Sequence, residues 1–552
     1  MSIYFKVVIY FSLIIIINGC EPQIQTVQPQ TAPVQPKQVD YLRLPLRSSV
    51  KTIDPGLIST KPSIELVEQL FLGLTSFDPE TYEIIAEFAQ DWQIYDEGTL
   101  YIFYLRQDVK WTNGDPVTAN DVVWTIRRNI IPKTNSPYAH TLYILQNAKA
   151  IHQGKITDIR ELGVRAIDDY TLEFKLEHAA SYFPALTSLW TYRPLPRKIV
   201  KKYGKDWTKP DNIQTNGSYM LTEWDKGNKL VLNKNPDYYQ ADKVQIPKIQ
   251  YNIVLKNDLA LAMYEQDELD IIGGKTYLQI PPRKISQIKS DPILRKDRYV
   301  SPDLCTEWYG FNMQRSPMDN ILVRKAIAAA IDKKTLLNVT NKREHIPTTT
   351  FTRSPVFGAV DPNEEIGIVF NPKRAKAWLA EAGYPDGKDF PEVVLMYNDT
   401  ANNKKQVTAV KTILKHSLNI NIEIHKFDFA TYANTLAQTT KPHMFRMSWC
   451  AADYPDAHNW LYTLFHPDKG INWVGWNNRE FADLVEQASR ISDPVERKDL
   501  YRRAEQILTE FEVAIVPLYF LNTQFLVKPW VKNWYPMAFG GQHIRDWVLE
   551  KN

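Results

Sequence analysis

Two kinds of hydrophobic periodicity alternate along most of this chain, and this alternation limits the fold more than any other feature. Residues 171–176 alternate apolar and polar side chains strictly, as a strand with one buried face requires. Residues 229–233 and 393–397 are two further predicted strands. Residues 321–332 instead place their apolar side chains on one helical face, with Asp319 available as a cap. Mixed strands and helices over 552 residues predict the α/β class, with some α+β character, in several domain-sized units.

Other segments carry clear start and stop signals. Residues 373–382 are predicted to form a helix that ends at Gly383. Asp493 begins an Asp-Pro-Val-Glu sequence, which is typical of a capping box with proline at the first helical position. We expect that helix to run to about Phe511 and to lead into a buried strand over residues 514–519.

The first 40 residues predict export and a membrane tether. Residues 7–17 form an apolar run behind Lys6 that is shorter than the roughly 20 residues needed to span a membrane, so we interpret residues 1–20 as a signal peptide. The run leads into Ile-Asn-Gly-Cys, which resembles a bacterial lipobox and predicts lipidation of Cys20. The alternative is ordinary cleavage with a free Cys20 thiol. Residues 21–40 are rich in Gln and Pro and predict a semi-extended tether.

Charge and local motifs argue against several classes of protein. With 66 Lys and Arg against 63 Asp and Glu, the net charge is only +3, and no basic stripe suggests a nucleic-acid partner. No HExxH, GxSxG or complete dinucleotide-binding motif is present, and Leu269 stands where a P-loop ending at residues 274–276 needs its first glycine. His443 and His458 are isolated histidines, which are more often structural than ligating. We expect no metal, no cofactor and no catalysis.

Eight motifs occur in the order in which one family of transport proteins carries them. They are residues 111–124 (WTNGDPVTANDVVW), 136–139 (SPYA), 215–219 (TNGSY), 304–312 (LCTEWYGFN), 323–326 (VRKA), 449–454 (WCAADY), 514–519 (AIVPLY) and 526–531 (LVKPWV). By these motifs the chain resembles the bacterial extracellular solute-binding proteins of family 5, in particular the oligopeptide-binding proteins of peptide ABC transporters.

The resemblance implies a class II periplasmic-binding-protein clamshell, with two lobes and an extra domain, that closes around its ligand by hinge motion. Lobe I would combine residues 41–73, 199–304 and 521–552, the extra domain II would be residues 74–198, and lobe III residues 305–520. The implied partners are short peptides and the permease subunits of an ABC importer. The protein would be a monomer in the periplasm or at the cell surface, anchored to the membrane as a lipoprotein.

The resemblance also implies where the charged ends of a peptide bind. Asp453 would pair with the α-ammonium and Arg446 with the carboxylate, since a guanidinium offers a two-point donor fork. Asn403 stands where relatives offer a histidine to longer peptides, and two alanines separate Cys450 from Asp453 where close relatives have one. From the residues alone, Asp453 and Asp456 could merely shape a turn, and Arg446 could lie on a solvated strand edge.

Three aromatic residues and two cysteines complete the implied site. Tyr138, Trp449 and Tyr519 match peptide-binding positions, although each could equally pack in a hinge or core. Cys305 and Cys450 fall where the family carries a disulfide. Two buried free thiols are the alternative, because the residues alone show only that one bridge could form in an oxidising compartment.

These features lead us to expect a binding protein that holds short oligopeptides by their backbone and charged ends. Both ends and every backbone group of a buried peptide must be paired, because unpaired buried polar groups are costly. The alternatives are the same fold with another solute (a murein peptide, a dipeptide, a nickel chelate, haem or a sugar) or, from another class, an exported peptidase. A second role as adhesin or signalling receptor is compatible with the fold.

Overall fold

The computed structural model describes residues 40–340, 342, 344–450 and 453–550. The predicted signal peptide, Cys20 and residues 21–39 of the predicted tether therefore lie outside the described residues. In the described part of the chain, no helix is both long and apolar enough to span a membrane. Across the same residues, the His, Cys, Asp and Glu side chains form no group of three or more that could hold a metal ion.

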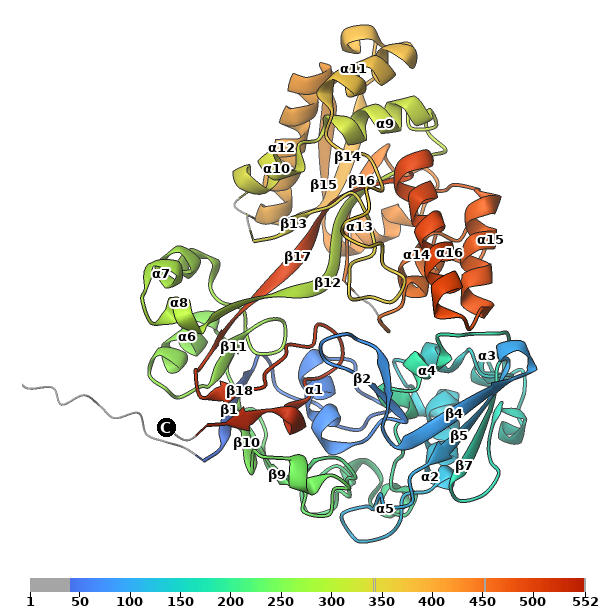
Figure 1. The fold of residues 1–552 in the computed structure, drawn as a ribbon, viewed down its shortest axis with the longest axis vertical. Coiled ribbons are helices and arrows are strands. Elements are labelled where there is room, and N and C mark those ends of the chain that lie inside the picture. Colours follow the sequence, from blue (N-terminus) through green and yellow to red (C-terminus); the bar gives the residue numbers. More distant parts are fainter. Residues whose placement is uncertain (1–39, 341, 343, 451–452, 551–552) are drawn as a thin grey trace, which may run out of the picture. The chain divides into compact units, whose positions relative to one another are not determined.

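Two four-stranded sheets are built mainly from the first half of the chain (Figure 1). One has the order β1-β10-β9-β8, in which β1 is parallel to β10 and the other neighbours are antiparallel. The other has the order β4-β5-β7-β6 and is antiparallel throughout. Their strands are β1 (Leu42–Leu46), β4 (Ala89–Tyr95), β5 (Leu100–Leu105), β6 (Val164–Ala166), β7 (Thr171–Lys175), β8 (Tyr219–Asp225), β9 (Lys229–Lys234) and β10 (Lys248–Ile253). The pairing of β1 with β10 joins segments that are distant in the sequence.

A seven-stranded mixed sheet dominates the second half of the chain. Its order is β11-β17-β12-β16-β14-β15, and β13 also pairs with β17. The two long strands β12 and β17 run antiparallel side by side (Figure 1), with β11 joined to β17 at one end of the sheet and β16 joined to β12 toward the other. The strands are β11 (Ile271–Gly273), β12 (Arg298–Phe311), β13 (Ile346–Pro347), β14 (Val393–Asn398), β15 (Ile422–Phe427), β16 (Met444–Trp449) and β17 (Ile515–Val527). Two short hairpins remain, β2 (Thr75–Phe77) with β3 (Ile84–Ala86) and β18 (Val531–Lys532) with β19 (Val548–Leu549).

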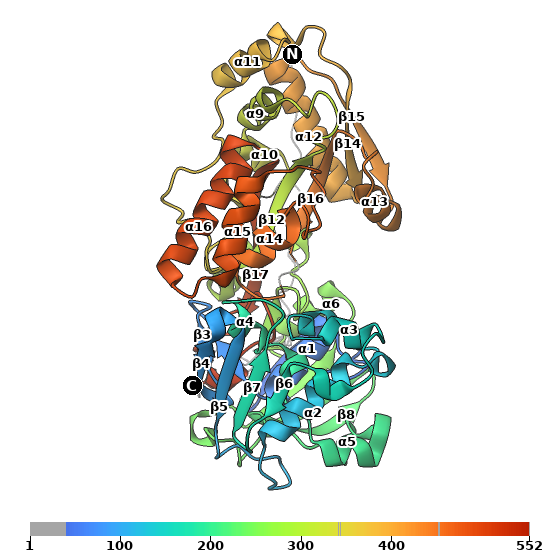
Figure 2. The same cartoon turned by 90° about the vertical axis from the view of Figure 1, so that its right-hand side faces the viewer.

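Six of the helices form two groups. The helices α9, α11 and α12 pack on one another, α12 also packs on β14 and β15, and α14, α15 and α16 form a separate group (Figure 2). The helices are α1 (Lys61–Leu70), α2 (Ala119–Ile130), α3 (Ala148–His152), α4 (Phe183–Leu186), α5 (Arg197–Tyr203), α6 (Asn257–Glu265), α7 (Ile285–Ser290), α8 (Leu294–Asp297), α9 (Ile321–Ala330), α10 (Lys333–Val339), α11 (Pro372–Glu381), α12 (Ala401–Leu418), α13 (Phe429–Leu436), α14 (Ala457–Phe465), α15 (Arg479–Arg490) and α16 (Pro494–Gln506). Their buried apolar faces divide among a large core, a second core around α9, α12 and β14, and a small one around α6.

The predicted α/β class is confirmed, and so are most of the predicted elements. The strands expected over residues 171–176, 229–233 and 393–397 are β7, β9 and β14, and the helix expected over residues 373–382 is α11. Asp493 caps α16 as predicted, because its carboxylate accepts hydrogen bonds from two backbone amides of the first turn, at 2.9 and 2.8 Å.

Two details of the sequence interpretation are wrong. The cap of α9 is Asn320 rather than Asp319, since the Asn320 side chain accepts from the Leu322 amide at 2.9 Å. The strand expected over residues 514–519 extends to Val527, because pairing with β12 holds its polar residues 522–524 in extended form. The helix that begins at Asp493 does reach Phe511 as expected: α16 ends at Gln506, and residues 507–511 continue it as a π-helical turn.

The domain boundaries proposed above stay a prediction. Two of them fall inside continuous strands: the one between residues 304 and 305 lies within β12, and the one between residues 520 and 521 lies within β17. The pairing of these two strands also changes register between Pro302 and Thr306. Such an irregularity locally interrupts a ladder.

Candidate functional site

A disulfide fixes the end of β16 to β12. Cys305 and Cys450 are bonded, with their Cα atoms 4.3 Å apart and a sequence separation of 145 residues. The neighbouring pair Thr306 and Trp449 is in register between the same two strands. The pairing implied by the family resemblance is therefore confirmed, and the alternative of two free thiols is wrong.

The other edge of β16 is only partly used. β16 pairs with β12 from Met444 to Trp449, but its pairing with β14 is limited to Met444 and Phe445. Among the described residues, no strand continues the ladder on that side from Arg446 to Trp449. The Arg446 carbonyl accepts from the Tyr432 hydroxyl, and the backbone groups that follow it on this edge are free to pair with an added strand.

Arg446 stands at the start of this edge and already has a partner. Its Nε and Nη2 donate to the two carboxylate oxygens of Glu307, each at 2.5 Å, and the Glu307 side chain is only 1% exposed. Burial alone would lower the pKa of Arg446, but the adjacent Glu307 carboxylate raises it. Only 14% of the Arg446 side chain is exposed. The alternative in which Arg446 lies on a solvated strand edge is thus wrong.

A hydrogen-bonded group extends from this ion pair. Gln406 of α12 donates to Glu307 at 2.7 Å and accepts from the Tyr519 hydroxyl at 2.7 Å and from the Lys342 ammonium at 2.8 Å. Lys342 also donates to the Tyr519 hydroxyl. We call these five residues, Arg446, Glu307, Gln406, Tyr519 and Lys342, the Arg446 cluster. It contains two cations and one carboxylate, so its net charge is positive when all three are ionised.

Asn403 adjoins the Arg446 cluster through Asn398. The Asn403 amide donates to both the backbone and the side-chain oxygen of Asn398 at 3.0 Å. The same Asn398 side-chain oxygen accepts from Nη1 of Arg446 at 3.3 Å. Three of the residues selected from the sequence, Arg446, Tyr519 and Asn403, are therefore brought together.

Asp453 belongs to a second group, with residues near the start of a short 3₁₀ helix over Ala139–Leu142. Its carboxylate is 32% exposed and lies 3.7 Å from His140 Nε2. Tyr138 is half-buried against Trp190, with ring centroids 4.8 Å apart, and burial and the nearby Asp453 charge raise the pKa of its hydroxyl. Asp453 is thus an accessible carboxylate beside aromatic side chains. Residues 451 and 452, which precede it, lie outside the described residues.

Asp456 differs from Asp453 in its burial and in its partners. It is buried, caps α14 by accepting from the His458 amide at 2.9 Å, and forms an ion pair with Arg497 at 2.7 Å. His458 is stacked between Tyr182 and the ring of Tyr462, at 4.1 and 4.4 Å, and burial lowers its pKa well below the ordinary value. These are structural roles.

Trp449 and His443 complete the residues selected from the sequence. Trp449 is partly buried against the large core, and its indole N–H has no hydrogen-bond partner among the described residues. His443 accepts from the backbone amide of Val394 at 3.1 Å, which joins the start of β16 to β14.

Comparison with known proteins identifies the family. The model of the bacterial extracellular solute-binding proteins, family 5, matches residues 83–472, which is more than half of the chain. This chain belongs to that family. The family-5 protein is 32% identical over 510 residues to the periplasmic oligopeptide-binding protein OppA of Salmonella typhimurium, covering 92% of this chain and 90% of the relative. It is also 31% identical to the probable deoxycholate-binding periplasmic protein YgiS of Escherichia coli, covering 95% of this chain and 94% of the relative.

A solved structure of the family has the same fold. The unliganded open form of MppA, a periplasmic murein tripeptide binding protein, superposes with a TM-score of 0.84 at 28% identity, covering 93% of this chain and 97% of that one. The multi-domain solute-binding fold expected from the motifs is therefore confirmed for this family-5 protein.

Sequence reasoning missed most partners of the selected residues. Glu307, Gln406 and Lys342 in the Arg446 cluster, and His140 beside Asp453, were not predicted. Glu307 lies inside the motif over residues 304–312, so a charged residue within an otherwise apolar strand sequence was an available signal. Gln406 and Lys342 carry no such signal.

Proposed function

We propose that this chain is the binding component of an ABC importer that captures short oligopeptides by their backbone and their two charged ends and delivers them to permease subunits. The partly unpaired edge of β16, which no strand covers from Arg446 to Trp449 among the described residues, carries the proposal. It offers backbone donors and acceptors to an extended peptide, as in strand addition. A positive cluster lies at one end of this edge, and an accessible carboxylate follows a few residues beyond the other.

The α-ammonium of the peptide pairs with Asp453 in this proposal. The carboxylate is partly exposed. Among the described residues its one ion-pair contact is with His140, whose Nε2 lies 3.7 Å from Asp453 Oδ2. An ammonium would gain a charge-assisted hydrogen bond there. Tyr138 and Trp190 supply apolar surface beside it, which excludes water and strengthens that bond.

The peptide carboxylate is assigned to the Arg446 cluster. Glu307 occupies two nitrogens of Arg446. The ligand is left with the second N–H of Nη1, whose first donates to Asn398, and the third N–H of Lys342, which also donates to Gln406 and Tyr519. A carboxylate arriving here would offset the remaining positive charge. Asn403 holds Asn398 in place next to Nη1 and acts as a positioning residue in this scheme. Trp449 is partly buried and contributes a flat surface at the edge itself.

Calorimetry with modified peptides tests this function. A free pentapeptide should bind, and acetylating its amino end or amidating its carboxyl end should each weaken binding about tenfold or more, because each removes one charge. Deoxycholate and a murein tripeptide serve as competing ligands, after the names of two relatives. If deoxycholate bound and no peptide did, oligopeptide capture would be rejected.

Two further experiments test the other proposed properties. We propose no catalysis, so the pentapeptide should be recovered intact by mass spectrometry after long incubation, and cleavage would revive the peptidase alternative. We also propose that Cys20 is lipidated and that the protein is a monomer outside the cytoplasm. Cys20→Ser should move the protein from the detergent phase to the aqueous phase in a phase-partition experiment, and retention with detergent would contradict lipidation.

A further inference from the structure

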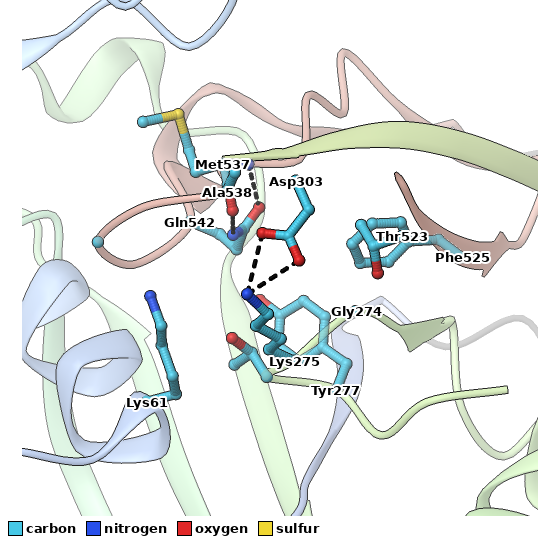
Figure 3. A pocket seen from close by; sticks show the side chains of 12 residues that line it. Lys61, Gly274, Lys275, Tyr277, Asp303, Thr523, Phe525, Met537, Ala538 and Gln542 are labelled. Carbon is cyan, nitrogen blue, oxygen red and sulfur yellow. Dashed lines mark hydrogen bonds and ion pairs between the residues drawn. The ribbon is translucent and has the colours of Figure 1, made fainter. Parts of the chain in front are cut away.

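A small cavity lies beside the first turn of α1 (Figure 3). Its volume is about 30 Å³, and it is partly open to solvent. Segments from five parts of the chain line it: the start of α1, residues 274–277 after β11, the middle of β12, the second half of β17, and residues 537–542 near the end. Two lysines and one aspartate are the charged groups of its wall: Lys61, Lys275 and Asp303.

The aspartate is already neutralised by one of the lysines. Lys275 Nζ lies 3.0 and 2.9 Å from the two carboxylate oxygens of Asp303, and the Asp303 side chain is only 9% exposed. The same nitrogen is 3.1 Å from Cys305 Sγ. This pair therefore leaves no net charge on its side of the cavity.

The second lysine has no such partner. The Lys61 side chain extends from α1 toward the cavity and faces Lys275 and Asp303 across it (Figure 3). Within the described residues, its ammonium forms no hydrogen bond and no ion pair. Burial, and then repulsion by Lys275, lower the pKa of Lys61 to about 8. Lys61 is only partly buried, so its ammonium keeps some contact with solvent, but it has no acceptor among the described residues of the cavity wall.

The nearest carboxylate on the same helix is fully used elsewhere. Glu65 lies one turn after Lys61, but its oxygens accept from the Tyr277 hydroxyl at 2.6 Å, the Tyr251 hydroxyl at 3.1 Å and the Gln542 amide at 2.9 Å. Glu65 therefore points into a saturated buried network. The charge of Lys61 remains available to a group that enters the cavity.

One wall residue of the cavity is linked to the proposed peptide-binding edge through the disulfide. Lys275 contacts Cys305, which is bonded to Cys450, and Cys450 directly follows β16 and precedes Asp453 by three residues. Side chains of a peptide added along β16 point alternately to the two sides of its backbone. These side chains therefore leave the sheet on its two faces, and those on one face point into the walls of the site.

We propose that this cavity is a subsite for a carboxylate on a side chain of the bound peptide, with Lys61 as its counter-ion. The inference rests on the proposed function and names a substrate class within it: peptides that carry an internal acidic residue. A carboxylate has the charge opposite to that of Lys61 and is small enough for a cavity of about 30 Å³. Lysine and arginine side chains are disfavoured, because Lys61 would repel them.

A matched peptide series tests the subsite. Each peptide of the series carries one Glu at a single internal position, and its partner carries Gln there, so size and backbone are unchanged. At pH 7 the wild-type protein should bind the Glu peptide about tenfold more tightly than its Gln partner at one position, because a charge-assisted hydrogen bond forms only with Glu. Lys61→Met should bring the two affinities together and leave the affinity for the Gln peptide unchanged.

Two further measurements sharpen the result. Lys198→Met removes an exposed lysine and should preserve the preference. At pH 8, calorimetry in buffers of different ionisation enthalpy should show proton uptake with the Glu peptide alone, and Lys61→Met should abolish it. Equal affinities for Glu and Gln at every internal position, or a preference that survives Lys61→Met, would overturn the subsite while peptide capture stands. If no peptide of the series binds, the proposed function fails, and the subsite fails with it.

Discussion

Two nitrogens of Arg446 hold the two carboxylate oxygens of Glu307 at 2.5 Å, across the ladder that joins β16 to β12. Both side chains are largely buried. The arginine selected as the partner of a ligand carboxylate thus has a resident carboxylate of its own. Binding in the proposed site must therefore use the third nitrogen of Arg446 and the neighbouring Lys342, and Glu307 sets how much positive charge is left for the ligand.

Glu307→Gln should destabilise the protein by about 3 kcal/mol, because it leaves a buried guanidinium without a counter-charge. Guanidinium-induced unfolding would measure the change. Replacing Glu307 and Arg446 together by Met should recover most of the loss, since no charge is then left unpaired. If Glu307→Gln were as stable as the wild type, the ion pair of Glu307 and Arg446 would have to be solvated in solution.

Asp453→Asn should weaken binding of a free pentapeptide by about 2 kcal/mol, roughly thirtyfold, because a neutral amide accepts a weaker hydrogen bond from an ammonium than a carboxylate does. The effect should disappear for the acetylated peptide, which has no ammonium. Asp468→Asn, at an exposed aspartate paired with Arg479, is the matched control in calorimetry. Equal losses for both peptides would place the ammonium elsewhere.

Cys450→Ser should lower the stability of the oxidised protein by about 4 to 5 kcal/mol in the chain-entropy model, because the bridge closes a loop of 145 residues. It should also weaken peptide binding, since it releases the chain three residues before Asp453. Thermal unfolding with and without reductant measures the first effect. Reductant should lower the unfolding temperature of the wild type and leave that of the variant unchanged.

Glu505→Gln should change how stability depends on pH. The buried Glu505 carboxyl accepts hydrogen bonds from the backbone amides of Phe351 and Thr352, and burial raises its pKa from 4.5 to about 7. Between these pH values the folded protein keeps a proton that the unfolded chain has lost, so this group's contribution to stability falls as pH rises from 4.5 to 7 and is constant above that.

The fall should amount to about 3 kcal/mol for this group. Unfolding temperatures of the wild type and of Glu505→Gln, compared from pH 4.5 to 8, should differ most at the acidic end in favour of the wild type. Glu496→Gln, on the exposed side of the same helix, should show the pH dependence of the wild type. A constant difference between the wild type and Glu505→Gln across the whole range would contradict the raised pKa.

Local patterns were sufficient for most of the secondary structure. The alternation in β7 and the Asp493 cap of α16 depend on neighbouring residues only, and both are confirmed. The second half of β17 could not be found this way, because Asn522, Thr523 and Gln524 resemble a solvated loop. They are extended because the distant strand β12 pairs with them, which is a long-range effect.

Several residues of the candidate site could be selected from the sequence, but most of their partners and their arrangement could not. Arg446 and Asp453 were selected through motifs, and so was the Cys305–Cys450 bridge. That Glu307 faces Arg446 depends on the register between β12 and β16, which joins segments far apart in the chain. The cavity at Lys61 is built from five separate segments, so no local pattern could have indicated it.

The partly unpaired edge of β16 also limits the size of the ligand. Strands rise about 3.3 Å per residue, so the backbone from Arg446 to Trp449 covers roughly 10 Å, and an extended peptide beside it places about four residues there. Asp453 lies four positions further along the chain. A dipeptide is then too short to reach both charges at once, and a chain of ten residues must leave the edge or loop outward. We therefore expect affinity to peak at intermediate length, near four to six residues in round terms, when free peptides of increasing length are compared.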